Sequence, residues 1–307
     1  MEERRFHVGS GIRKINYGER QMSDKNVWFI TGCSTGFGRE LAKHLLENDY
    51  RVVVTARDIE KVQDLVDINK ENALPIRLDV TDKSQVADAI AKAENHFGKI
   101  DVLVNNAGFG YFGAIEESDE KEVRSMFETN FWGLAEVTRA ALPKMRERRS
   151  GTIVNISSIG GFAGFPSVGY YNATKFAVNG FSEALKKELA PLGIKVIMVN
   201  PSGFRTDWAG RSANDATVKI ADYAETSGTF QSNVRGYSGN QPGDPVRAAK
   251  AIVAAMESAD PPSYLLLGKV ALQTARQKLE DLKRDFDDWA EVTEGADFPE
   301  AESAQVG

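Results

Sequence analysis

The sequence is poor in the residues that build disulfides and metal sites. Its 307 residues include one cysteine, Cys33, and three histidines. One cysteine excludes a disulfide within the chain and is typical of a reducing compartment, so we expect a cytoplasmic protein. The histidines, His7, His44 and His96, are scattered along the chain. No cluster of cysteine and histidine has the spacing of a zinc site. We therefore predict no metal site.

Long apolar runs and excess positive charge are also lacking. No run approaches the roughly 18 apolar residues that a membrane span needs, and residues 1–21 lack the apolar core of a signal peptide. The formal net charge of −6 gives no electrostatic case for binding nucleic acid. The content of 42% hydrophobic and 27% charged residues is ordinary for a soluble globular protein.

The most informative stretch that is present runs from residue 155 to 175. Residues 151–157 have the β-branched pattern of a buried strand, and Ser158 follows, before a glycine-rich loop. Tyr171 and Lys175 then open an apolar run that favours a helix, on which residues four apart share one face. We expect the three side chains to meet at the end of the strand.

This trio suits hydride chemistry on a carbonyl group. Reduction produces an alkoxide that needs a proton, and oxidation requires removal of the alcohol proton. A tyrosine with its ordinary pKa of roughly 10 is a poor base at neutral pH, and a neighbouring Lys175 ammonium would lower that pKa. Ser158 can hydrogen-bond the substrate oxygen and orient it. The alternative, that Tyr171 is an ordinary aromatic and Lys175 a solvated charge, is less consistent with this combination.

The combination resembles the short-chain dehydrogenase/reductase family, in its single-domain branch, over about residues 26–267. Together with the alternation of strand and helix patterns, the resemblance implies an α/β fold. We expect a Rossmann-type, doubly wound sheet of seven parallel strands with helices on both faces. This NADP-binding domain would span residues 22–268. The end of the chain is most similar to the group that contains 17β-hydroxysteroid and retinol dehydrogenases.

A glycine-rich turn follows the first predicted strand, residues 27–30, and precedes a helical pattern. In this position glycines let the backbone approach a pyrophosphate, whose charge lies at the helix N-terminus. The spacing matches the T-G-x-x-x-G-x-G of the family rather than G-x-G-x-x-G. The cofactor residues expected here are Gly32, Ser34, Gly36, Phe37 and Gly38.

The end of the second predicted strand, residues 51–56, bears on the choice of cofactor. An acid about 20 residues after the glycines usually holds the ribose of NAD, but Ala56 stands at the matching position. Arg57 follows, and its guanidinium suits a 2′-phosphate, to which Ser34 could add a hydroxyl. Asp58 could instead pair with Arg57, which could also be a solvated surface charge. We favour NADP(H) over NAD(H).

The resemblance implies further cofactor contacts. They include the adenine-contacting pair after the third strand, the N-N-A-G segment after the fourth, and the loop after the sixth. Ser202 replaces the family's usual glycine in that last loop, which puts its backbone geometry in doubt. The residues carried over by position are Asp79, Val80, Asn106, Ala107, Gly108, Pro201 and Thr206, together with Tyr171 and Lys175.

Asn130 is the fourth catalytic residue that the resemblance implies. It lies inside a helix predicted over residues 120–145, together with Gly133, and both residue types are poor helix formers. In the family, the asparagine at this place bends the helix and supports a proton relay. The alternative is a tolerated buried asparagine.

Residues 207–243 are irregular, polar and aromatic, where the family keeps its substrate lid. With residues 109–112 and 162–166, we expect this segment to line an apolar pocket for a hydrophobic ketone, aldehyde or alcohol. The alternative is that the aromatic side chains are local anchors. The lid aromatics are Trp208, Tyr223, Phe230 and Tyr237.

Residues 269–307 contain an apolar pattern in steps of three and four residues, which predicts an amphipathic helix. Because about three heptads are present, packing on its own domain is favoured over a coiled coil, and a subunit contact is possible. The tail after about Gly295 and the extension 1–21 are predicted to be disordered. By resemblance, the protein is expected to form a homodimer or homotetramer.

The sequence as a whole predicts an NADP(H)-dependent oxidoreductase that acts on a small hydrophobic carbonyl or alcohol. Tyr171 would be the general acid/base, Lys175 would tune it and bind the ribose, Ser158 would orient the carbonyl, and Asn130 would support the relay. The main alternative is a non-catalytic NADP(H)-sensing protein on the same fold. A sugar epimerase of the extended branch is disfavoured, because its G-x-x-G-x-x-G motif and larger C-terminal domain are absent.

Overall fold

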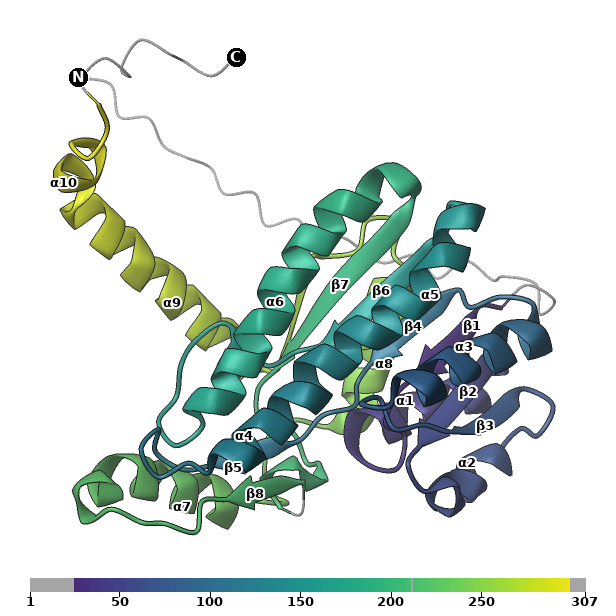
Figure 1. Cartoon of the computed structure of the whole chain (residues 1–307), viewed down its shortest axis with the longest axis horizontal. Helices are drawn as coiled ribbons and strands as arrows, with labels where there is room; N and C mark the ends of the chain where they lie inside the picture. Colours follow the sequence, from purple (N-terminus) through teal and green to yellow (C-terminus); the bar gives the residue numbers. More distant parts are fainter. Residues whose placement is uncertain (1–24, 211, 299–307) are drawn as a thin grey trace.

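Seven parallel strands form the central sheet, in the order β3-β2-β1-β4-β6-β7-β9 (Figure 1). The computed structural model describes residues 25–210 and 212–298, so the predicted extension 1–21 and the tail from residue 299 lie outside the described residues. The strands are β1 Val27–Ile30, β2 Arg51–Ala56, β3 Ala73–Arg77, β4 Val102–Asn105, β6 Gly151–Ile156, β7 Ile194–Pro201 and β9 Tyr264–Leu267. The predicted Rossmann-type sheet is confirmed. Its strand order reverses between β1 and β4, where open α/β sheets bind ligands.

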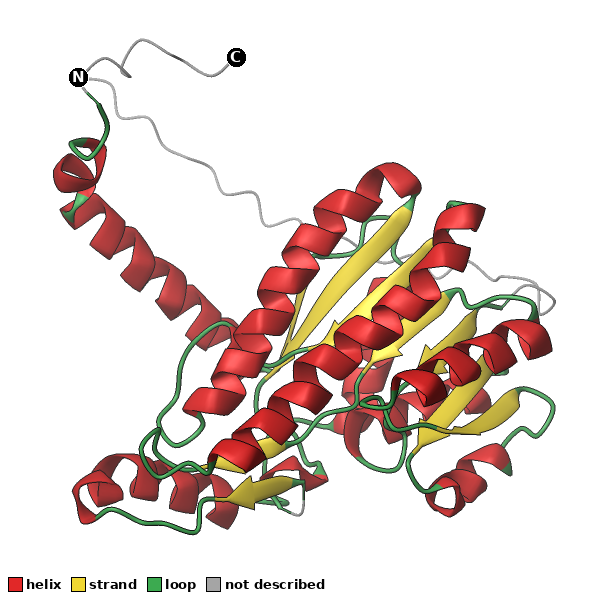
Figure 2. Ribbon diagram, viewed as in Figure 1, coloured by secondary structure: helices red, strands yellow, loops and turns green. Residues whose placement is uncertain are grey.

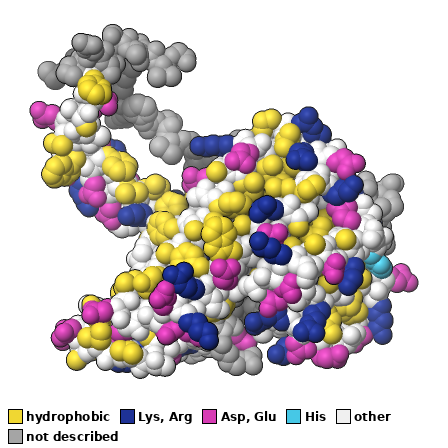
Figure 3. All heavy atoms as spheres, in the orientation of Figure 1, with side chains coloured by type: hydrophobic (Ala, Val, Ile, Leu, Met, Phe, Trp, Pro, Cys, Tyr) yellow, Lys and Arg dark blue, Asp and Glu magenta, His cyan; other side chains and the backbone are white. Residues whose placement is uncertain are grey.

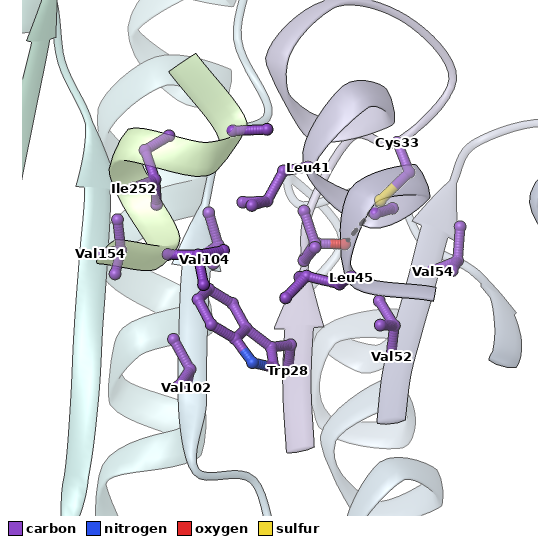
Figure 4. Packing of buried hydrophobic residues seen from close by; sticks show 14 of the residues in the cluster. Trp28, Cys33, Leu41, Leu45, Val52, Val54, Val102, Val104, Val154 and Ile252 are labelled. Atoms are coloured by element: carbon purple, nitrogen blue, oxygen red, sulfur yellow. Dashed lines mark hydrogen bonds between the residues drawn. The ribbon is translucent and has the colours of Figure 1, made fainter. Parts of the chain in front are cut away.

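Helices cover both faces of this sheet (Figure 2). Successive side chains of a strand point to opposite faces of the sheet, so alternate residues of β1 contribute to different cores. Because both faces are covered, the strand is apolar throughout. Trp28 packs with α1 and α8, as Figure 4 shows, and Ile30 belongs to the same cluster, while Phe29 faces α3, α5 and α6. The helices are α1 Gly36–Glu47, α2 Gln63–Val66, α3 Lys83–Phe97, α5 Leu134–Arg148, α6 Gly169–Leu189 and α8 Pro245–Glu257.

The helix predicted over residues 120–145 is present, with a bulge in its middle. Helix α4, Glu120–Phe127, leads into a π-helical turn, Glu128–Gly133, and then into α5. Asn130 lies in that turn and is buried. A π-turn inside an α-helix carries one extra residue per turn and often marks a functional site.

The segment predicted as a lid folds beside the carboxyl ends of the strands. It contributes β8, Ala213–Asp215, which pairs in parallel with β5, Gly110–Phe112, and the short helix α7, Thr229–Gly236. A separate apolar cluster joins this segment to α4 and α6. The lid is therefore held by packing of its own as well as by its two ends.

Helix α9, Lys269–Asp288, leaves the body of the molecule and continues into α10, Ala290–Glu294 (Figure 1). Only Ala271 and Ala275 of α9 are buried, against Ile159. The prediction that the apolar stripe of this helix packs on its own domain is therefore wrong beyond the second turn. The helix diverges from the sheet directly after Gly268, whose φ of 93° turns the chain away from β9. Within the described residues, no helix is long and apolar enough to cross a membrane.

Candidate active site

Ser158 is placed by the end of β6. The strand ends at Ile156, and Ser158 caps a single helical turn by accepting a hydrogen bond from the Gly160 amide at 3.0 Å. Asn172 of α6 holds the loop that follows, donating to the Gly160 carbonyl at 3.0 Å and accepting from the Phe165 amide at 2.9 Å. The catalytic loop and α6 are thereby tied together.

Tyr171 lies on α6 where it meets Ser158, as the sequence predicted. The Ser158 hydroxyl acts on the Tyr171 hydroxyl, and Tyr171 is 8% exposed. Burial raises the pKa of Tyr171 to about 12, and the Ser158 hydroxyl opposes this rise. The prediction that Lys175 lowers this pKa is not met by the protein alone: burial raises it, and Ser158 is the group that opposes the rise.

Lys175 is also on the predicted face of α6. Its Nζ lies 5.7 Å from the centroid of the Tyr171 ring and donates to the Ile156 carbonyl at 2.9 Å. The residue is 5% exposed, and burial lowers the pKa of Lys175 to about 8. The end of β6 and the first turns of α6 therefore bring Ser158, Tyr171 and Lys175 together, as predicted.

Asn130 is close to this trio, and its side chain forms hydrogen bonds that connect two other segments of the chain. It accepts a hydrogen bond from the Phe109 amide at 3.0 Å and donates to the Phe109 carbonyl at 2.9 Å. It also lies 3.2 Å from the Thr174 hydroxyl, to which it donates. A Cβ added at Gly108 would lie 3.0 Å from Asn130 Oδ1 and 3.8 Å from Lys175 Nζ. Asn130 thus joins the end of β4 to α6, while its role in a relay stays a prediction.

The glycine-rich turn fits the pyrophosphate of a dinucleotide. Gly32 and Gly36 adopt φ values of 73° and 63°, a region that favours glycine. Thr35 begins α1 without a side-chain cap, and the first turn of the helix contains no acid. The first amide groups of α1 are therefore available to an anion. A Cβ added at Gly36 would lie 3.8 Å from Thr206 Cβ, so the loop after β7 faces this turn as predicted.

Asn106 holds the turn in this shape. Its amide donates to the Thr31 and Gly32 carbonyls, each at 2.9 Å, and the Thr31 hydroxyl accepts from the backbone amides of Asn106 and Ala107. A Cβ added at Gly38 would lie only 2.4 Å from the Asn106 side chain. This close packing requires glycine at position 38 and makes Asn106 a support of the cradle.

Arg57 follows the end of β2 and is exposed. The expected competitor, Asp58, is engaged elsewhere: it accepts from the Glu60 amide at 3.3 Å and pairs with Lys61 at 3.7 Å. Among residues 25–210 and 212–298, no ion pair of Arg57 is found. Its guanidinium is therefore available to a phosphate at the edge of the cradle.

Other predicted cofactor contacts are constrained by packing. The Val80 side chain is buried against Gly133, and the Phe37 ring packs edge-on against Phe204 at 5.1 Å. At these two positions the backbone, rather than the side chain, is left to face a ligand. The Asp79 carboxylate accepts from both the amide and the hydroxyl of Thr81.

The loop after Pro201 accommodates Ser202 in place of the glycine that the family usually has there. Ser202 donates from both its amide and its hydroxyl to the Leu267 carbonyl, at 3.0 and 3.3 Å. Gly268 is required there, because an added Cβ would lie 2.5 Å from Ser202 Oγ. The serine therefore ties the loop to β9 and leaves Pro201 at the end of β7.

The predicted lid brings Trp208 onto Tyr171. Their ring centroids lie 5.0 Å apart, and Trp208 is also 5.5 Å from Phe112. Phe230 stacks on Phe165 at 6.0 Å, so these aromatics anchor one another as well as facing the site. Tyr223 and Tyr237 are elsewhere: Tyr223 donates from its hydroxyl to Glu116 at the surface, and Tyr237 is exposed.

Two charged residues hold the lid, and sequence reasoning did not find them. Arg235 of α7 donates to the Ala209 and Ala213 carbonyls at 3.0 and 2.7 Å and lies 4.7 Å from the Phe112 ring centroid. The buried Glu117 carboxylate accepts from the Ala114 and Ile220 amides at 2.9 and 2.8 Å. A single arginine or glutamate carries no spacing signal that distinguishes such a contact from a surface charge.

The comparisons with known proteins agree with this geometry. Residues 26–217 match the family model described as short chain dehydrogenase. The chain belongs to the short-chain dehydrogenase family. Oxidoreductase BOA17 of Botryotinia fuckeliana is 38% identical over 268 residues, which cover 87% of this chain and 97% of that protein. The subtype that contains 17β-hydroxysteroid and retinol dehydrogenases stays a prediction.

Another member of the family has a named reaction. The 3-ketodihydrosphingosine reductase of Bacteroides thetaiotaomicron is 42% identical over 205 residues, which cover 65% of this chain and 72% of that protein. A solved short-chain dehydrogenase from Streptomyces avermitilis is 41% identical, with a TM-score of 0.84, covering 89% of this chain and 98% of that one.

Two solved neighbours contain cofactors. A short-chain dehydrogenase/reductase from Burkholderia phymatum, in complex with NAD, is 27% identical with a TM-score of 0.75, covering 87% of this chain and 97% of that one. ElxO with NADP bound is 32% identical with a TM-score of 0.67, covering 81% of this chain and all of that one. The family is therefore one of oxidoreductases whose members bind NAD or NADP.

Proposed function

We propose that this chain is an NADP(H)-dependent oxidoreductase that interconverts a hydrophobic ketone or aldehyde and its alcohol. The observation that carries the proposal is the meeting of three groups: the buried Tyr171, the Ser158 hydroxyl that lowers its pKa, and the buried Lys175 ammonium 5.7 Å from the tyrosine ring. These groups lie beyond the carboxyl ends of the strands, on the side of the sheet that holds the glycine-rich cradle.

The side chains divide the proton chemistry between them. When bound, the reduced nicotinamide supplies a hydride to the carbonyl carbon. Ser158 donates a hydrogen bond to the carbonyl oxygen, and Tyr171 transfers its phenolic proton to that oxygen as negative charge develops there. Because the pKa of Tyr171 is about 12, the proton is present at neutral pH. The Lys175 ammonium then stabilises the phenolate that remains.

Arg57 supports NADP(H) over NAD(H). Its exposed guanidinium follows β2, and the carboxylate next to it in the chain, Asp58, pairs with Lys61. A planar guanidinium suits the geometry and charge of a 2′-phosphate. Because solved neighbours bind either cofactor, this residue is the specific support for the phosphate.

The aromatic lid supports an apolar substrate. Trp208, Phe112 and Phe165 belong to a cluster that also contains Tyr171, so a substrate that reaches the phenol must lie against rings. The named reductase from Bacteroides thetaiotaomicron, which acts on 3-ketodihydrosphingosine, is consistent with a ketone bearing a long apolar portion.

The test is a panel of ketones and aldehydes assayed with NADPH and NADH, following cofactor absorbance. Turnover with apolar carbonyls should fall by about 10²–10⁴-fold in Tyr171→Phe. Tyr170→Phe removes the hydroxyl of the neighbouring tyrosine and should leave turnover unchanged. Turnover that persists in Tyr171→Phe would contradict the proposed proton transfer.

The same experiment addresses a non-catalytic NADP(H) sensor. Such a protein would bind NADPH, detected by the change in its fluorescence, yet turn over no carbonyl in the panel. The buried Tyr171 beside Ser158 favours the enzyme, because binding a cofactor alone does not require a phenol held at this point.

A further inference from the structure

Helix α9 carries an apolar stripe that the described part of the chain leaves uncovered. Leu279, Phe286 and Trp289 are 56%, 66% and 64% exposed, and Leu272 is also exposed. Figure 3 shows hydrophobic side chains along this projecting arm. Single exposed apolar residues are common, but a row of large ones on one helix marks an interaction surface.

The stripe has the spacing of a two-helix seam. Leu272, Leu279 and Phe286 are seven residues apart, and each is followed three residues later by another apolar side chain. Alternating steps of three and four place all six on one side of the helix, as in a coiled coil. The six residues are Leu272, Ala275, Leu279, Leu282, Phe286 and Trp289; Ala275 packs on Ile159 of the body, so the seam consists of the other five.

The distribution of charge along residues 269–298 favours a second copy of α9 as the partner that covers the stripe. Residues 269–278 contain three bases and no acid, whereas residues 279–298 contain eight acids and two bases. A second α9 running antiparallel places the basic half of each copy against the acidic half of the other. A parallel copy would place like charges together. The net negative charge of residues 269–298 also disfavours an anionic membrane surface, which attracts basic helices.

We propose that α9 pairs antiparallel with α9 of a second copy of this chain. With the stripe centred on itself, Leu279 lies opposite Leu282 of the partner subunit, and Leu272 opposite the partner's Trp289. Lys278 then faces Asp285 of the partner subunit, and the two-fold axis repeats this pair.

One other charge pair beside the seam is unfavourable in this register, because both of its members are basic. Arg276 would lie near Lys283 of the partner subunit, but Lys283 forms an ion pair with Asp287 within its own helix. Arg284 is likewise paired with Asp281, at 3.1 Å. The pairing of α9 helices is independent of the proposed chemistry, because none of these residues belongs to the active site.

Cross-linking of the full chain tests the register directly. The double variant K278C/D285C should form a disulfide-linked dimer under mild oxidation. Within one helix these positions are about 10 Å apart, beyond the roughly 7 Å that a disulfide can bridge. Each single variant should stay uncross-linked, and the native Cys33 is buried. Failure of the double variant to cross-link would overturn the proposal, as would cross-linking of L279C alone, which requires a parallel pair.

Charge reversal provides a second, independent measurement. In analytical ultracentrifugation, K278E and D285K should each weaken the dimer formed through α9, by about tenfold or more in Kd. K278E/D285K should restore it, because each exchanged charge again faces its opposite. L279E/F286E should abolish it, whereas V246E, at an exposed apolar residue of α8, should not. Equal weakening by the single and double reversals would contradict the antiparallel register.

The same variants distinguish a second copy of the chain from two other partners that could cover the stripe, a membrane and the chain's own N-terminal segment. Co-sedimentation with phosphatidylcholine vesicles that L279E/F286E abolishes would identify a membrane and overturn the proposal. A chain that dimerises through α9 only after residues 1–24 are removed would identify its own N-terminal segment as the occupant, with the same consequence. Cross-linking of K278C/D285C that is equal with and without residues 1–24 supports the second copy.

Discussion

At the residue scale, burial acts on the two titrating groups of the site in opposite directions. It raises the pKa of Tyr171 and lowers that of Lys175, because both charged forms lose solvation. At pH 7 the pair is therefore a phenol beside an ammonium, since the Lys175 pKa of about 8 still lies above neutrality. This combination suits proton donation to a carbonyl oxygen.

A pH-dependent stability should follow from Lys175. Its pKa is about 8 when folded and 10.5 ordinarily, so between these values the unfolded chain binds more protons. The free energy of unfolding should rise with pH across this window, relative to Lys175→Met, by an amount on the order of 2–3 kcal/mol. Urea unfolding of both proteins at pH 7.5, 9 and 10 measures the difference. A difference that is constant with pH would show that the ammonium is not buried in solution.

Arg57 sets a prediction on cofactor choice. Loss of a charge-assisted contact should remove about 1.5–3 kcal/mol of binding free energy, or roughly 10–100-fold in affinity. Arg57→Ala should therefore raise the KM for NADPH by that factor and leave the KM for NADH nearly unchanged. Arg247→Ala, at an exposed arginine of α8, is the matched control. Equal effects on the two cofactors would remove the argument for the 2′-phosphate.

At the scale of elements, two irregular segments position the site. The π-turn around Asn130 joins the end of β4 to α6, and the lid places Trp208 on Tyr171. Arg235 holds the lid through hydrogen bonds to the carbonyls of Ala209 and of Ala213, the first residue of β8. It also contacts the Phe112 ring. The lid is thus an ordered part of the site, connected to the body by a small number of polar contacts.

Arg235 should control substrate binding more than cofactor binding. Arg235→Met removes the hydrogen bonds to Ala209 and Ala213 while keeping an apolar side chain against Phe112. The KM for the carbonyl substrate should rise by roughly tenfold or more, because about 1–3 kcal/mol of lid contacts is lost. The dissociation constant for NADPH, measured by fluorescence titration, should stay the same. A parallel loss of NADPH affinity would mean that Arg235 supports the cradle as well.

On the scale of the whole molecule, the sheet and its two helical layers form the body, and α9 extends from it. The first turns of α9 nevertheless belong to the body, because Ala271 and Ala275 pack on Ile159 and Phe162 directly after Ser158. The projecting part beyond Lys278 contributes little to this core. The helix therefore has a structural base and a free arm.

Truncation should separate these two parts. A chain ending at Lys278 should bind NADPH and turn over substrate as the full chain does, while losing the α9-dependent dimer. A chain ending at Gly268 should lose stability and turnover, because it uncovers Ile159 and Phe162 beside the catalytic loop. Thermal melting and the carbonyl assay measure both outcomes. Equal behaviour of the two truncations would show that the base of α9 does not support the site.

The active-site trio and the sheet could be predicted because their signals are local. Tyr171 and Lys175 share a helix face by spacing alone, and the glycine-rich turn stands between a strand and a helix in sequence. Asn130 and Gly133 stand out as poor helix formers within a helical pattern, but the π-turn that contains them is seen only in the structure. By contrast, Arg235 and Glu117 act on residues far away in the chain, and nothing near them in the sequence marks those partners.

The sequence by itself determined the strand and helix pattern, the glycine-rich turn before α1 and the helix face shared by Tyr171 and Lys175, because periodicity and short-range spacing specify them. The tertiary structure decided that burial raises the Tyr171 pKa, that Trp208 rather than Tyr223 or Tyr237 covers the phenol, and that α9 leaves the body. Each of these depends on which distant segments pack together and how much water they exclude, quantities that a local pattern does not contain.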